Sequence, residues 1–378
     1  MHFAGPSDIM PIMNWLSLYK GRLIVAGPCS VESHHQLLAT AQGLSQTGRV
    51  TVLRAGLWKP RSRPGKFEGV GARAFPWLKE IKEKTGMQIA VEAAMPEHAT
   101  LCLKHGVDMI WLGARTTVNP FMVQEIADAI KGSGIPVMIK NPVSPDVRLW
   151  VGAIERVHLA GSNKIIAIHR GFHNHEQSIY RNIPLWEIPM QLKRELPGLP
   201  VICDPSHIAG NRKWVKEVAQ IAFSRELDGL MIETHHKPEE ALTDAHQQIT
   251  PAELTQILDD LFDESETPAQ AATLKSLRNR IDEQDYQILE LLAKRMRLVK
   301  EVGTLKKALG EDVVQPGRQQ KLLDDREQKG SMLNLNKPFI RKIMQLVHEE
   351  SVNIQSTLAH SESRAEHKEQ NKPTQKHS

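Results

Sequence analysis

A short apolar run followed by a helix-like segment occurs eight times between residues 23 and 233, and this repetition restricts the possible folds more than any other feature. The runs are short and mostly apolar, as expected for strands that are covered on both faces. Strands that alternate with helices pair in parallel through right-handed crossovers. The sequence therefore predicts a parallel α/β fold. The eight runs are Leu23–Ala26, Val50–Arg54, Gln88–Glu92, Met109–Leu112, Pro136–Ile139, Lys164–Ile168, Pro200–Cys203 and Gly229–Ile232.

Eight strand–helix units in about 240 residues are typical of a (β/α)8 barrel, or TIM barrel, rather than of an open doubly wound sheet. The first run is not followed by a glycine-rich dinucleotide-binding motif, which counts against a nicotinamide-binding fold. We therefore predict that residues 1–262 form a (β/α)8 barrel domain.

The overall composition excludes several classes of protein. The 48 basic residues barely exceed the 44 acidic ones, so the net charge of +4 gives no argument for binding to nucleic acid or to an anionic membrane. No stretch approaches the roughly 18 consecutive apolar residues of a membrane helix. The first residues have neither a basic start nor a long apolar stretch, and three cysteines cannot form a secreted disulfide framework. We expect a cytoplasmic protein that binds neither nucleic acid nor membrane.

The pattern changes after residue 258, where acidic residues and Pro268 indicate an exposed linker, which we assign to residues 263–273. Beyond it, residues with spacings of three and four form a heptad seam, which predicts a helix of about 35 residues and about 50 Å. Such a helix needs a partner, and we expect a second copy of the chain. The seam residues are Leu274, Leu277, Ile281, Gln284, Ile288, Leu291, Arg295, Leu298, Val302, Leu305 and Leu309.

Two further helices are predicted, at residues 319–329 and from residue 337 to about residue 360. Together with the seam helix they define an all-α domain at residues 274–360. Residues 361–378 are polar and contain no aromatic side chain, so we predict a disordered tail.

Charged residues gather at the predicted strand ends, where the active site of a (β/α)8 barrel lies. Three arginines and a lysine at one mouth would repel each other unless an anion held them together. Because guanidinium groups match carboxylates and phosphates bidentately, a ligand that carries both groups is the natural guest. The residues at the strand ends are Cys29, Arg54, Glu92, Arg115, Lys140, Arg170, Asp204 with His207, and Glu233.

A second set of residues has the character of metal ligands: Cys29, His207, Glu233 and Asp244. One thiolate, one imidazole and two carboxylates suit a divalent ion such as Mn, Fe, Co or Zn better than magnesium. His235 and His236 lie near enough to compete as ligands. Cys29 must be a thiolate to bind metal, and without metal we expect that thiolate to be open to oxidation.

Six motifs that occur in order across residues 15 to 260 resemble 3-deoxy-D-arabino-heptulosonate 7-phosphate synthases of the short type I-beta kind. The resemblance implies condensation of phosphoenolpyruvate with erythrose 4-phosphate, with release of phosphate, by a metal-dependent enzyme. Ser62 stands where many relatives have threonine and keeps the hydroxyl group. The motifs are Gly27-Pro28-Cys29-Ser30, Lys59-Pro60-Arg61-Ser62, Gly113-Ala114-Arg115-Thr116, Lys140-Asn141-Pro142, His169-Arg170-Gly171 and Cys203-Asp204-Pro205-Ser206-His207.

The resemblance also implies roles for individual residues. The metal ligands would be Cys29, His207, Glu233 and Asp244. Phosphoenolpyruvate would be surrounded by Arg115, Lys140 and Arg170, with Arg54 and Glu92 nearby. The aldose phosphate would be held by Lys59, Arg61 and Ser62, with Lys59 reaching toward both substrates.

The alternative for the barrel is the related 3-deoxy-octulosonate 8-phosphate synthase, which uses arabinose 5-phosphate. The related enzyme carries a lysine-alanine-asparagine-arginine turn where this chain has Lys59-Pro60-Arg61-Ser62. A proline there fixes the backbone and places the arginine for the shorter sugar. We therefore favour the four-carbon substrate.

The heptad seam of the predicted long helix carries two polar residues, Gln284 and Arg295. A single polar seam residue can serve only to fix the register. Lys306, however, follows Arg295 by 11 residues and lies on nearly the same face, so two cations on one inward stripe indicate an anionic ligand. Arg278 precedes Arg295 by 17 residues, which separates them by about 25 Å along the axis. Arg278 therefore cannot share a small-molecule site with Arg295 of its own chain, whereas the site of a partner chain could use it.

These positions resemble all-helical chorismate mutases over about residues 270 to 358. The resemblance implies an intertwined dimer that rearranges chorismate to prephenate, with each site completed by Arg278 of the partner subunit. Gln319 stands where many relatives have glutamate to accept the substrate hydroxyl, and Gln315 replaces a common aspartate. The substrate carboxylates would bind Arg295, Arg318 and Arg278 of the partner subunit, the ether oxygen would bind Lys306 and Gln355, and Ser351 would complete the site.

The rearrangement is pericyclic and needs no acid, base or metal, only a compact substrate conformer and positive charge beside the breaking bond. The alternative is a helical module that only dimerises the chain or senses chorismate. Retention of Arg278, Arg295, Lys306 and Gln355 argues against pure dimerisation. We also expect that the helical domain acts as an allosteric sensor for the barrel.

Overall fold

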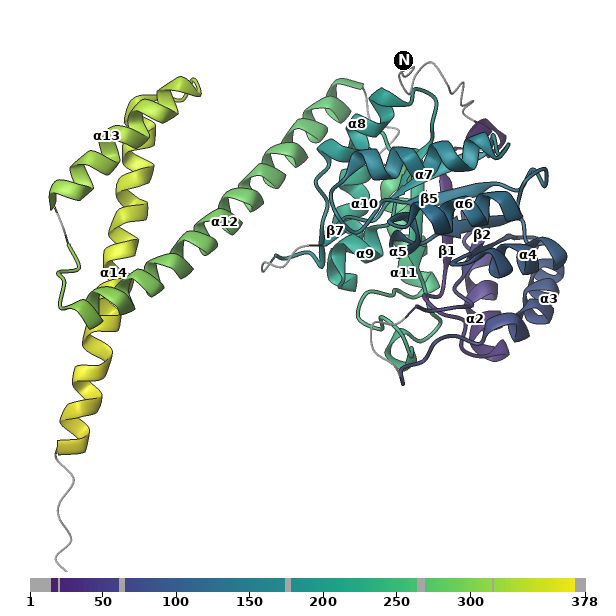
Figure 1. Ribbon diagram of the computed structural model, residues 1–378, viewed down its shortest axis with the longest axis horizontal. Coiled ribbons are helices and arrows are strands. Elements are labelled where there is room, and N and C mark those ends of the chain that lie inside the picture. Colours follow the sequence, from purple (N-terminus) through teal and green to yellow (C-terminus); the bar gives the residue numbers. More distant parts are fainter. Residues whose placement is uncertain are drawn as a thin grey trace, which may run out of the picture. The chain divides into compact units, whose positions relative to one another are not determined.

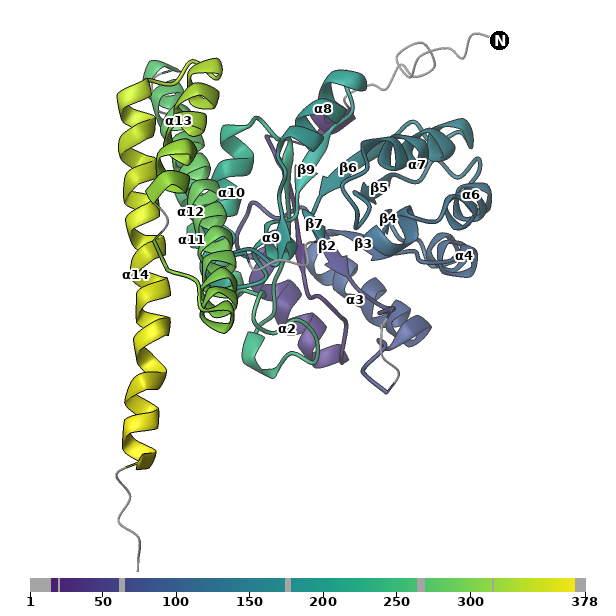
Figure 2. The same ribbon diagram turned by 60° about the vertical axis from the view of Figure 1, so that its left-hand side comes forward.

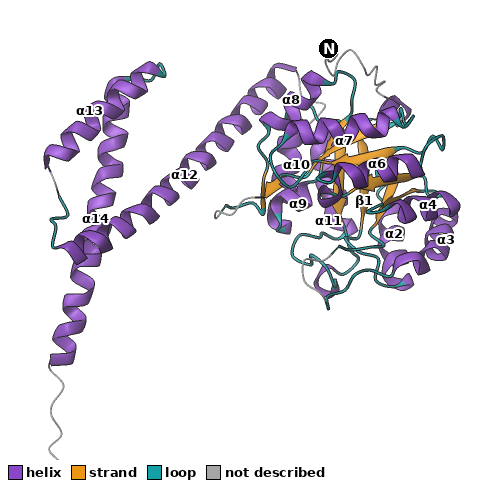
Figure 3. Ribbon diagram, viewed as in Figure 1, coloured by secondary structure: helices purple, strands orange, loops and turns teal. Residues whose placement is uncertain are grey.

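The computed structural model describes residues 15–19, 21–60, 65–173, 178–263, 269–314 and 316–370. The chain divides into two compact units, Met1–Arg280 and Ile281–Ser378. The first unit contains a group of strands surrounded by helices, and the second contains only helices (Figure 1, Figure 3).

Eight parallel strands close into a barrel, which confirms the predicted fold class. Each strand pairs with its neighbours in the chain, apart from a short hairpin inserted after the sixth, and β10 pairs with β1 to close the ring. The observed bounds agree with the eight apolar runs to within two residues. The strands are β1 (Leu23–Gly27), β2 (Val52–Ala55), β3 (Gln88–Glu92), β4 (Met109–Leu112), β5 (Val137–Lys140), β6 (Ile165–His169), β9 (Val201–Cys203) and β10 (Gly229–Glu233).

Helices cover the outside of the barrel (Figure 2). Local signals set several of their ends: Asn119 and Asp146 accept backbone N–H groups as N-caps, and Gly86 ends a helix in the left-handed conformation. In the described part of the chain, no helix is both long enough and apolar enough to cross a membrane. The helices of the first unit are α2 (His34–Ser45), α3 (Phe75–Thr85), α4 (Pro96–Lys104), α5 (Ala114–Thr117), α6 (Pro120–Ala129), α7 (Val147–Leu159), α8 (Glu187–Glu195), α9 (Pro205–Ala209), α10 (Val215–Ser224) and α11 (Pro251–Asp263), with 3₁₀ turns at Trp15–Leu18, Gly71–Ala74, Arg212–Trp214 and Pro238–Glu240.

Side chains alternate along each strand between two buried layers. In β1, Ile24 packs in the layer between strands and helices, whereas Leu23 and Val25 belong to a second cluster inside the barrel. Trp15 joins that inner cluster and donates from its indole nitrogen to the carbonyl of Ile165 at 3.3 Å, at the start of β6. The end of the barrel where the strands begin is therefore packed with apolar side chains, and the end where the strands finish is left for the site.

A short antiparallel pair, β7 (Phe172–His173) with β8 (Asn182–Ile183), lies beyond the end of β6. The sequence does not predict this pair, because two residues per strand are too few for a periodic pattern.

The second unit is built from α12 (Ala269–Leu309), α13 (Pro316–Met332) and α14 (Lys337–Gln370). The three predicted helices are present, but α12 begins five residues before the predicted start at Leu274. The predicted tail of 361–378 differs from the structure over residues 361–370, where α14 continues as a helix. This stretch contains no proline or glycine to stop a helix. Residues 371–378 lie outside the described residues.

The heptad seam of α12 is exposed in the single chain. Its apolar side chains are between 44% and 72% exposed, with Val302 and Leu309 at the two extremes. At the seam position Arg295 and at Gly303, α12 instead contacts α14: Arg295 donates to Ser351, and Gly303 packs against Gln355 and Leu358. Val299, which lies between them, is buried. The seam is therefore free to pack against another helix.

Candidate functional site

The alternation along the strands places charged residues inside the mouth of the barrel. In β5, Met138 lies in the inner cluster and Ile139 in the outer layer, so Lys140, the last residue, faces inward again. In the same way, the charged residue near the end of β2, β3 and β10 faces inward, because the residue two positions before it lies in the inner cluster. The inward charged residues are Arg54, Glu92, Lys140 and Glu233, with exposures of 1%, 9%, 5% and 0%.

Three of the predicted metal ligands form a compact group. The ligand atoms of Cys29, Glu233 and Asp244 all lie within 4.8 Å of one another. Gly27, near the end of β1, pairs with Glu233 in β10, which brings Cys29 and Glu233 together at the seam that closes the barrel. Asp244 enters from the loop after β10 and accepts a hydrogen bond at 3.3 Å from the thiol of Cys29. One sulfur and two carboxylates at this spacing fit a borderline divalent ion.

His207 lies beside this group, in the short helix α9 that follows β9. Its Nδ1 is 2.9 Å from Asp204 Oδ2, and its Nε2 is 3.8 Å from Glu233 Oε1. A carboxylate partner at one ring nitrogen is the arrangement typical of a metal-binding histidine, because it fixes the tautomer and leaves the other nitrogen as the ligand.

The competing histidines, His235 and His236, do not join the group of potential metal ligands found among the described residues. His235 is buried, and its Nδ1 accepts a hydrogen bond from the backbone of Lys237 at 3.0 Å. The two rings stack on each other with centroids 4.8 Å apart.

Buried ion pairs hold the acids of the site in the charged form. Lys140 Nζ lies 2.7 Å from Asp204 Oδ2, and Arg54 Nη2 lies 3.1 Å from Glu233 Oε1. Burial by itself would raise the pKa of Asp204, but His207 and Lys140 hold that pKa well below its ordinary value. In the same way, His207 and Arg54 overcome the effect of burial and lower the pKa of Glu233.

The cations of the site differ: the pKa is lowered for Arg170 and Lys140, whereas it is raised for Arg54, Lys59 and Arg181. Burial lowers the pKa of Arg170 to about 10 despite the nearby Asp204, and the neighbouring Arg181 and Arg115 lower it further. Burial also lowers the pKa of Lys140, against the attraction of Asp204. An anionic ligand would oppose these two decreases in pKa, because it would restore favourable interactions for the crowded cations.

These side chains surround a pocket of about 740 Å³. Seven of its sixteen lining residues are lysine or arginine and only two are acidic, as expected for a ligand with phosphate and carboxylate groups. The residues that line it are Arg54, Lys59, Pro60, Lys66, Glu92, Gly113, Ala114, Arg115, Lys140, Val143, Arg170, His173, Arg181, Asn182, His207 and Asp244.

The pocket brings together most of the residues predicted for the barrel. Lys59 is half-buried, and Arg115 is exposed because it lies on α5, beyond the end of β4. A Cβ atom on Gly113 would lie 2.3 Å from Glu92 Oε1, so a larger residue there would make the Glu92 carboxylate move. Arg61 and Ser62 lie outside the described residues.

Several functional residues escaped the sequence analysis. Lys66 and Arg181 line the pocket from loops and Asn182 lines it from β8, and Gln247 donates to Glu233 Oε2 at 2.6 Å. Asp204 stands at a predicted strand end, but its pairing with both Lys140 and His207 could not be foreseen. No spacing signal could have found the loop residues, because loops have no fixed period.

In the helical unit, Arg295 of α12 donates to Ser351 Oγ and to the carbonyl of Val347 in α14. Burial lowers the pKa of Arg295, and the nearby Arg326 lowers it further. An anionic ligand beside Arg295 would oppose this decrease in pKa, because it would stabilise the charged guanidinium group. The predicted partners Arg295 and Ser351 are thus in direct contact.

The other predicted residues of this unit are more dispersed. Gln355 packs against Gly303, where a Cβ atom would lie 3.0 Å from its Cγ, and its buried Oε1 has no hydrogen-bond partner in the described structure. Lys306 Nζ donates to the carbonyls of residues 312 and 313, both at 2.9 Å. Arg278 and Arg318 are exposed, and Gln319 is half-buried.

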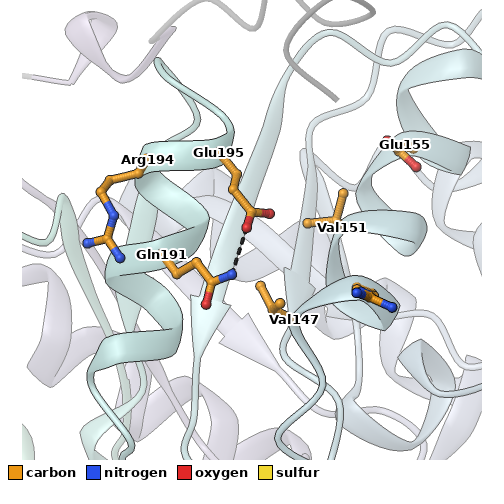
Figure 4. A pocket seen from close by; sticks show the side chains of 7 residues that line it. Val147, Val151, Glu155, Gln191, Arg194 and Glu195 are labelled. Atoms are coloured by element: carbon orange, nitrogen blue, oxygen red, sulfur yellow. Dashed lines mark hydrogen bonds between the residues drawn. The ribbon is translucent and has the colours of Figure 1, made fainter. Parts of the chain in front are cut away.

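A separate pocket of about 650 Å³ lies between α7 and α8, on the outside of the barrel (Figure 4). Gln191 and Glu195 are hydrogen-bonded to each other at 2.7 Å along one wall. It is lined by two valines, two arginines, two glutamates and a glutamine.

Comparisons with known proteins agree with this division of the chain. Residues 20–267 match the DAHP synthetase I family, and residues 277–356 match chorismate mutase type II. A phospho-2-dehydro-3-deoxyheptonate aldolase of Thermotoga maritima is 32% identical over 226 residues, which are 60% of this chain and 64% of that protein. A 2-dehydro-3-deoxyphosphooctonate aldolase of Nitratidesulfovibrio vulgaris is 27% identical over 59% of this chain and 84% of its own length.

The crystal structure of a Thermotoga maritima DAHP synthase aligns with a TM-score of 0.60 and 29% identity, over 66% of this chain and 70% of that one. A truncated form of the synthase from the same organism aligns with a TM-score of 0.57 and 27% identity, over 66% of this chain and 88% of that one. The chain thus spans 64% of the length of the aldolase from Thermotoga.

The surroundings of Cys29 correct one expectation about its chemistry. Burial, together with the nearby Glu233, raises the pKa of the Cys29 thiol to about 12. Without metal, Cys29 is therefore a protonated thiol at neutral pH, and the expectation of a reactive metal-free thiolate is wrong. Cys102 and Cys203 are also buried, and burial raises the pKa of both thiols.

Alkylation can test the raised pKa of the Cys29 thiol. Because the pKa is raised, the thiolate of Cys29 is scarce below pH 12, and the metal-free protein should react with iodoacetamide at pH 8 about 1,000-fold more slowly than free cysteine. The rate should rise about tenfold per pH unit while the protein stays folded. Peptide mass spectrometry gives the rate at each cysteine, with the denatured chain as the control. Rapid labelling of Cys29 at pH 7 in the folded protein would contradict the raised pKa.

Proposed function

Because the chain belongs to the DAHP synthetase I family and continues into a chorismate mutase type II segment, we propose that it is a bifunctional enzyme. The barrel condenses phosphoenolpyruvate with erythrose 4-phosphate to 3-deoxy-D-arabino-heptulosonate 7-phosphate. The helical unit rearranges chorismate to prephenate. The observation that carries the first activity is the cationic pocket with the compact Cys29, Glu233 and Asp244 group at its edge.

The residues of the barrel suit the condensation. Arg115, Lys140 and Arg170 bind the phosphate and carboxylate of phosphoenolpyruvate, and Lys59 reaches from the opposite loop toward both substrates. The Lys140 ammonium group, held by Asp204 at 2.7 Å, stabilises negative charge while water adds at C2 and phosphate leaves. Arg54 and Glu92 complete the wall around this substrate.

The donor set also fits a divalent ion of the Mn, Fe, Co or Zn class, held by Cys29, His207, Glu233 and Asp244. When bound, such an ion polarises the aldehyde oxygen of the second substrate as a Lewis acid. Asp204 holds Nδ1 of His207, so that Nε2 is left as its ligand atom. Cys29 would hold the ion as a thiolate, so metal affinity would increase with pH.

A 3-deoxy-octulosonate 8-phosphate synthase is the second candidate, since relatives of that kind also match the barrel. The Lys59-Pro60-Arg61-Ser62 motif favours the four-carbon sugar, because its proline fixes the backbone and places the arginine for the shorter sugar. Comparing activity with erythrose 4-phosphate and arabinose 5-phosphate decides between the two. Higher activity with the five-carbon sugar would reject the preferred substrate.

The helical unit supplies positive charge for the rearrangement. Arg295, fixed by Ser351, binds a substrate carboxylate, and Arg318 takes the second with Arg278 of the partner subunit. Lys306 and Gln355 donate to the ether oxygen, and Gln319 accepts from the substrate hydroxyl. The exposed apolar seam of α12 supports pairing with a second copy of the chain, because a stripe of this length is rarely left in water. No metal takes part.

Removing metal should separate the two activities. A chelator should abolish the condensation, which depends on the ion, and spare the rearrangement, which does not. Both reactions would be assayed on the purified full chain, with Mn²⁺ added back as the control. Loss of both activities, or of neither, would count against the metal assignment.

Mixed dimers can test the shared mutase sites. Arg278→Ala and Arg295→Ala should each be nearly inactive alone, because each leaves both sites short of one cation. Coexpression should recover up to about a quarter of wild-type activity, since half of the dimers are mixed and each of these keeps one intact site. Absence of recovery in verified mixed dimers would mean that each site is built within one chain.

We further propose that the helical unit acts as a sensor for the barrel. Prephenate should inhibit the synthase to the extent that it binds a restrained state more tightly, with a typical coupling of about 5–150-fold. Arg295→Ala in the full chain should abolish the inhibition and leave uninhibited synthase activity unchanged, whereas the surface variant Lys321→Ala should keep it. If prephenate does not inhibit the wild-type synthase, fusion serves only to keep the two enzymes at equal abundance.

A further inference from the structure

Arg181 lies between the cationic pocket and the candidate metal group. It lines the pocket, yet its hydrogen bonds are directed to residues of the metal side. Nη1 donates to Asp244 Oδ1 at 2.9 Å and to Gln247 Oε1 at 2.7 Å. One guanidinium nitrogen therefore holds two residues of the loop that follows β10.

Both bonds lead to proposed metal ligands. Asp244 is one of them, and its second oxygen, Oδ2, accepts from the thiol of Cys29. Gln247 connects Arg181 to the other carboxylate, because its Nε2 donates to Glu233 Oε2 at 2.6 Å. Arg181 thus fixes one carboxylate directly and the second through a single amide group.

The loop needs such support at Asp244. This residue has a φ angle of 47°, in the left-handed region that non-glycine residues adopt at a cost. The Arg181 bond to its side chain stabilises this conformation and aims the carboxylate at the group.

Arg181 is itself held in place. Its backbone N–H donates to the carbonyl of Ala209 at 3.4 Å, and a Cβ atom at Gly210 would lie 2.3 Å from the Arg181 Cβ. The next residue, Asn182, donates from Nδ2 to the carbonyl of His207 at 2.6 Å and accepts from Arg170 at 2.7 Å. The segment that carries Arg181 is therefore docked on α9, which also carries His207.

We propose that Arg181 is a positioning residue that orients Asp244 and, through Gln247, Glu233 for metal binding. This inference rests on the proposed metal site of the barrel. Arg181 acts through the ligands rather than on the substrate, although it borders the substrate pocket. Such supporting residues typically change metal affinity by 10–100-fold.

The alternative is that Arg181 is simply one more cation for the substrate anions. The two roles differ in the absence of substrate: a positioning residue changes metal affinity then, and a substrate-binding residue does not. Metal binding to the substrate-free protein is therefore the decisive measurement.

The experiment uses the full chain, stripped of metal and titrated with Mn²⁺ while free Mn²⁺ is followed by electron paramagnetic resonance. Arg181→Met and Gln247→Leu should each weaken Mn²⁺ binding by about 10–100-fold. Arg181→Lys, which keeps the charge but not the planar fork, should fall between Arg181→Met and wild type. The matched control is Arg212→Met: Arg212 also bonds the loop, at the carbonyl oxygens of residues 245 and 246, but touches no proposed ligand. It should bind Mn²⁺ as wild type does.

Wild-type affinity in both Arg181→Met and Gln247→Leu would overturn the inference, as would an equal loss in Arg212→Met, which would indicate general support of the loop. If circular dichroism shows that Arg181→Met is not folded, Gln247→Leu and Arg181→Lys decide. Failure of the metal site itself looks different: wild type would not bind Mn²⁺, or Cys29→Ser would bind it unchanged.

Discussion

The barrel unit depends on the buried pairing of opposite charges at the mouth of a closed parallel barrel. Closure fixes which side chains face inward, so the last inward layer is enclosed on all sides whatever its chemistry. Here that layer is charged, and Arg54 with Glu233 and Lys140 with Asp204 are paired at 3.1 and 2.7 Å. Removing one partner of such a buried pair typically costs about 3–5 kcal/mol, because the other charge is left uncompensated.

This pairing also explains how one pocket can carry both a cationic wall and a set of acidic ligands. Asp204 and Glu233 stay ionised in spite of their burial because His207, Lys140 and Arg54 lie against them. The crowded cations beyond them are left in need of an anion, which is what a phosphorylated substrate supplies. The same network of ion pairs thus keeps the acids charged and prepares the site for an anionic ligand.

The helical unit follows a different principle, since its single chain does not bury its own apolar surface. Arg295 and Gly303 of α12 contact α14, while the apolar side chains of the heptad seam remain exposed. Whereas the barrel can be understood from one chain, the chemistry of the helical unit is understood best with a second copy. The contrast follows from the lengths involved: a helix of 41 residues is too long to be covered by two shorter neighbours.

Much of this protein follows from the sequence, because periodic patterns and strand ends are local properties of the chain. The apolar runs predict all eight barrel strands, and the residues after them include Cys29, Lys140 and Glu233, which meet at one mouth for topological reasons alone. Only the tertiary structure decides which charges pair, that Cys29 is a neutral thiol without metal, and that Arg181 and Gln247 support the ligands. Those facts depend on distances between loops that are remote in the chain, and on burial, neither of which has a period that a sequence can display.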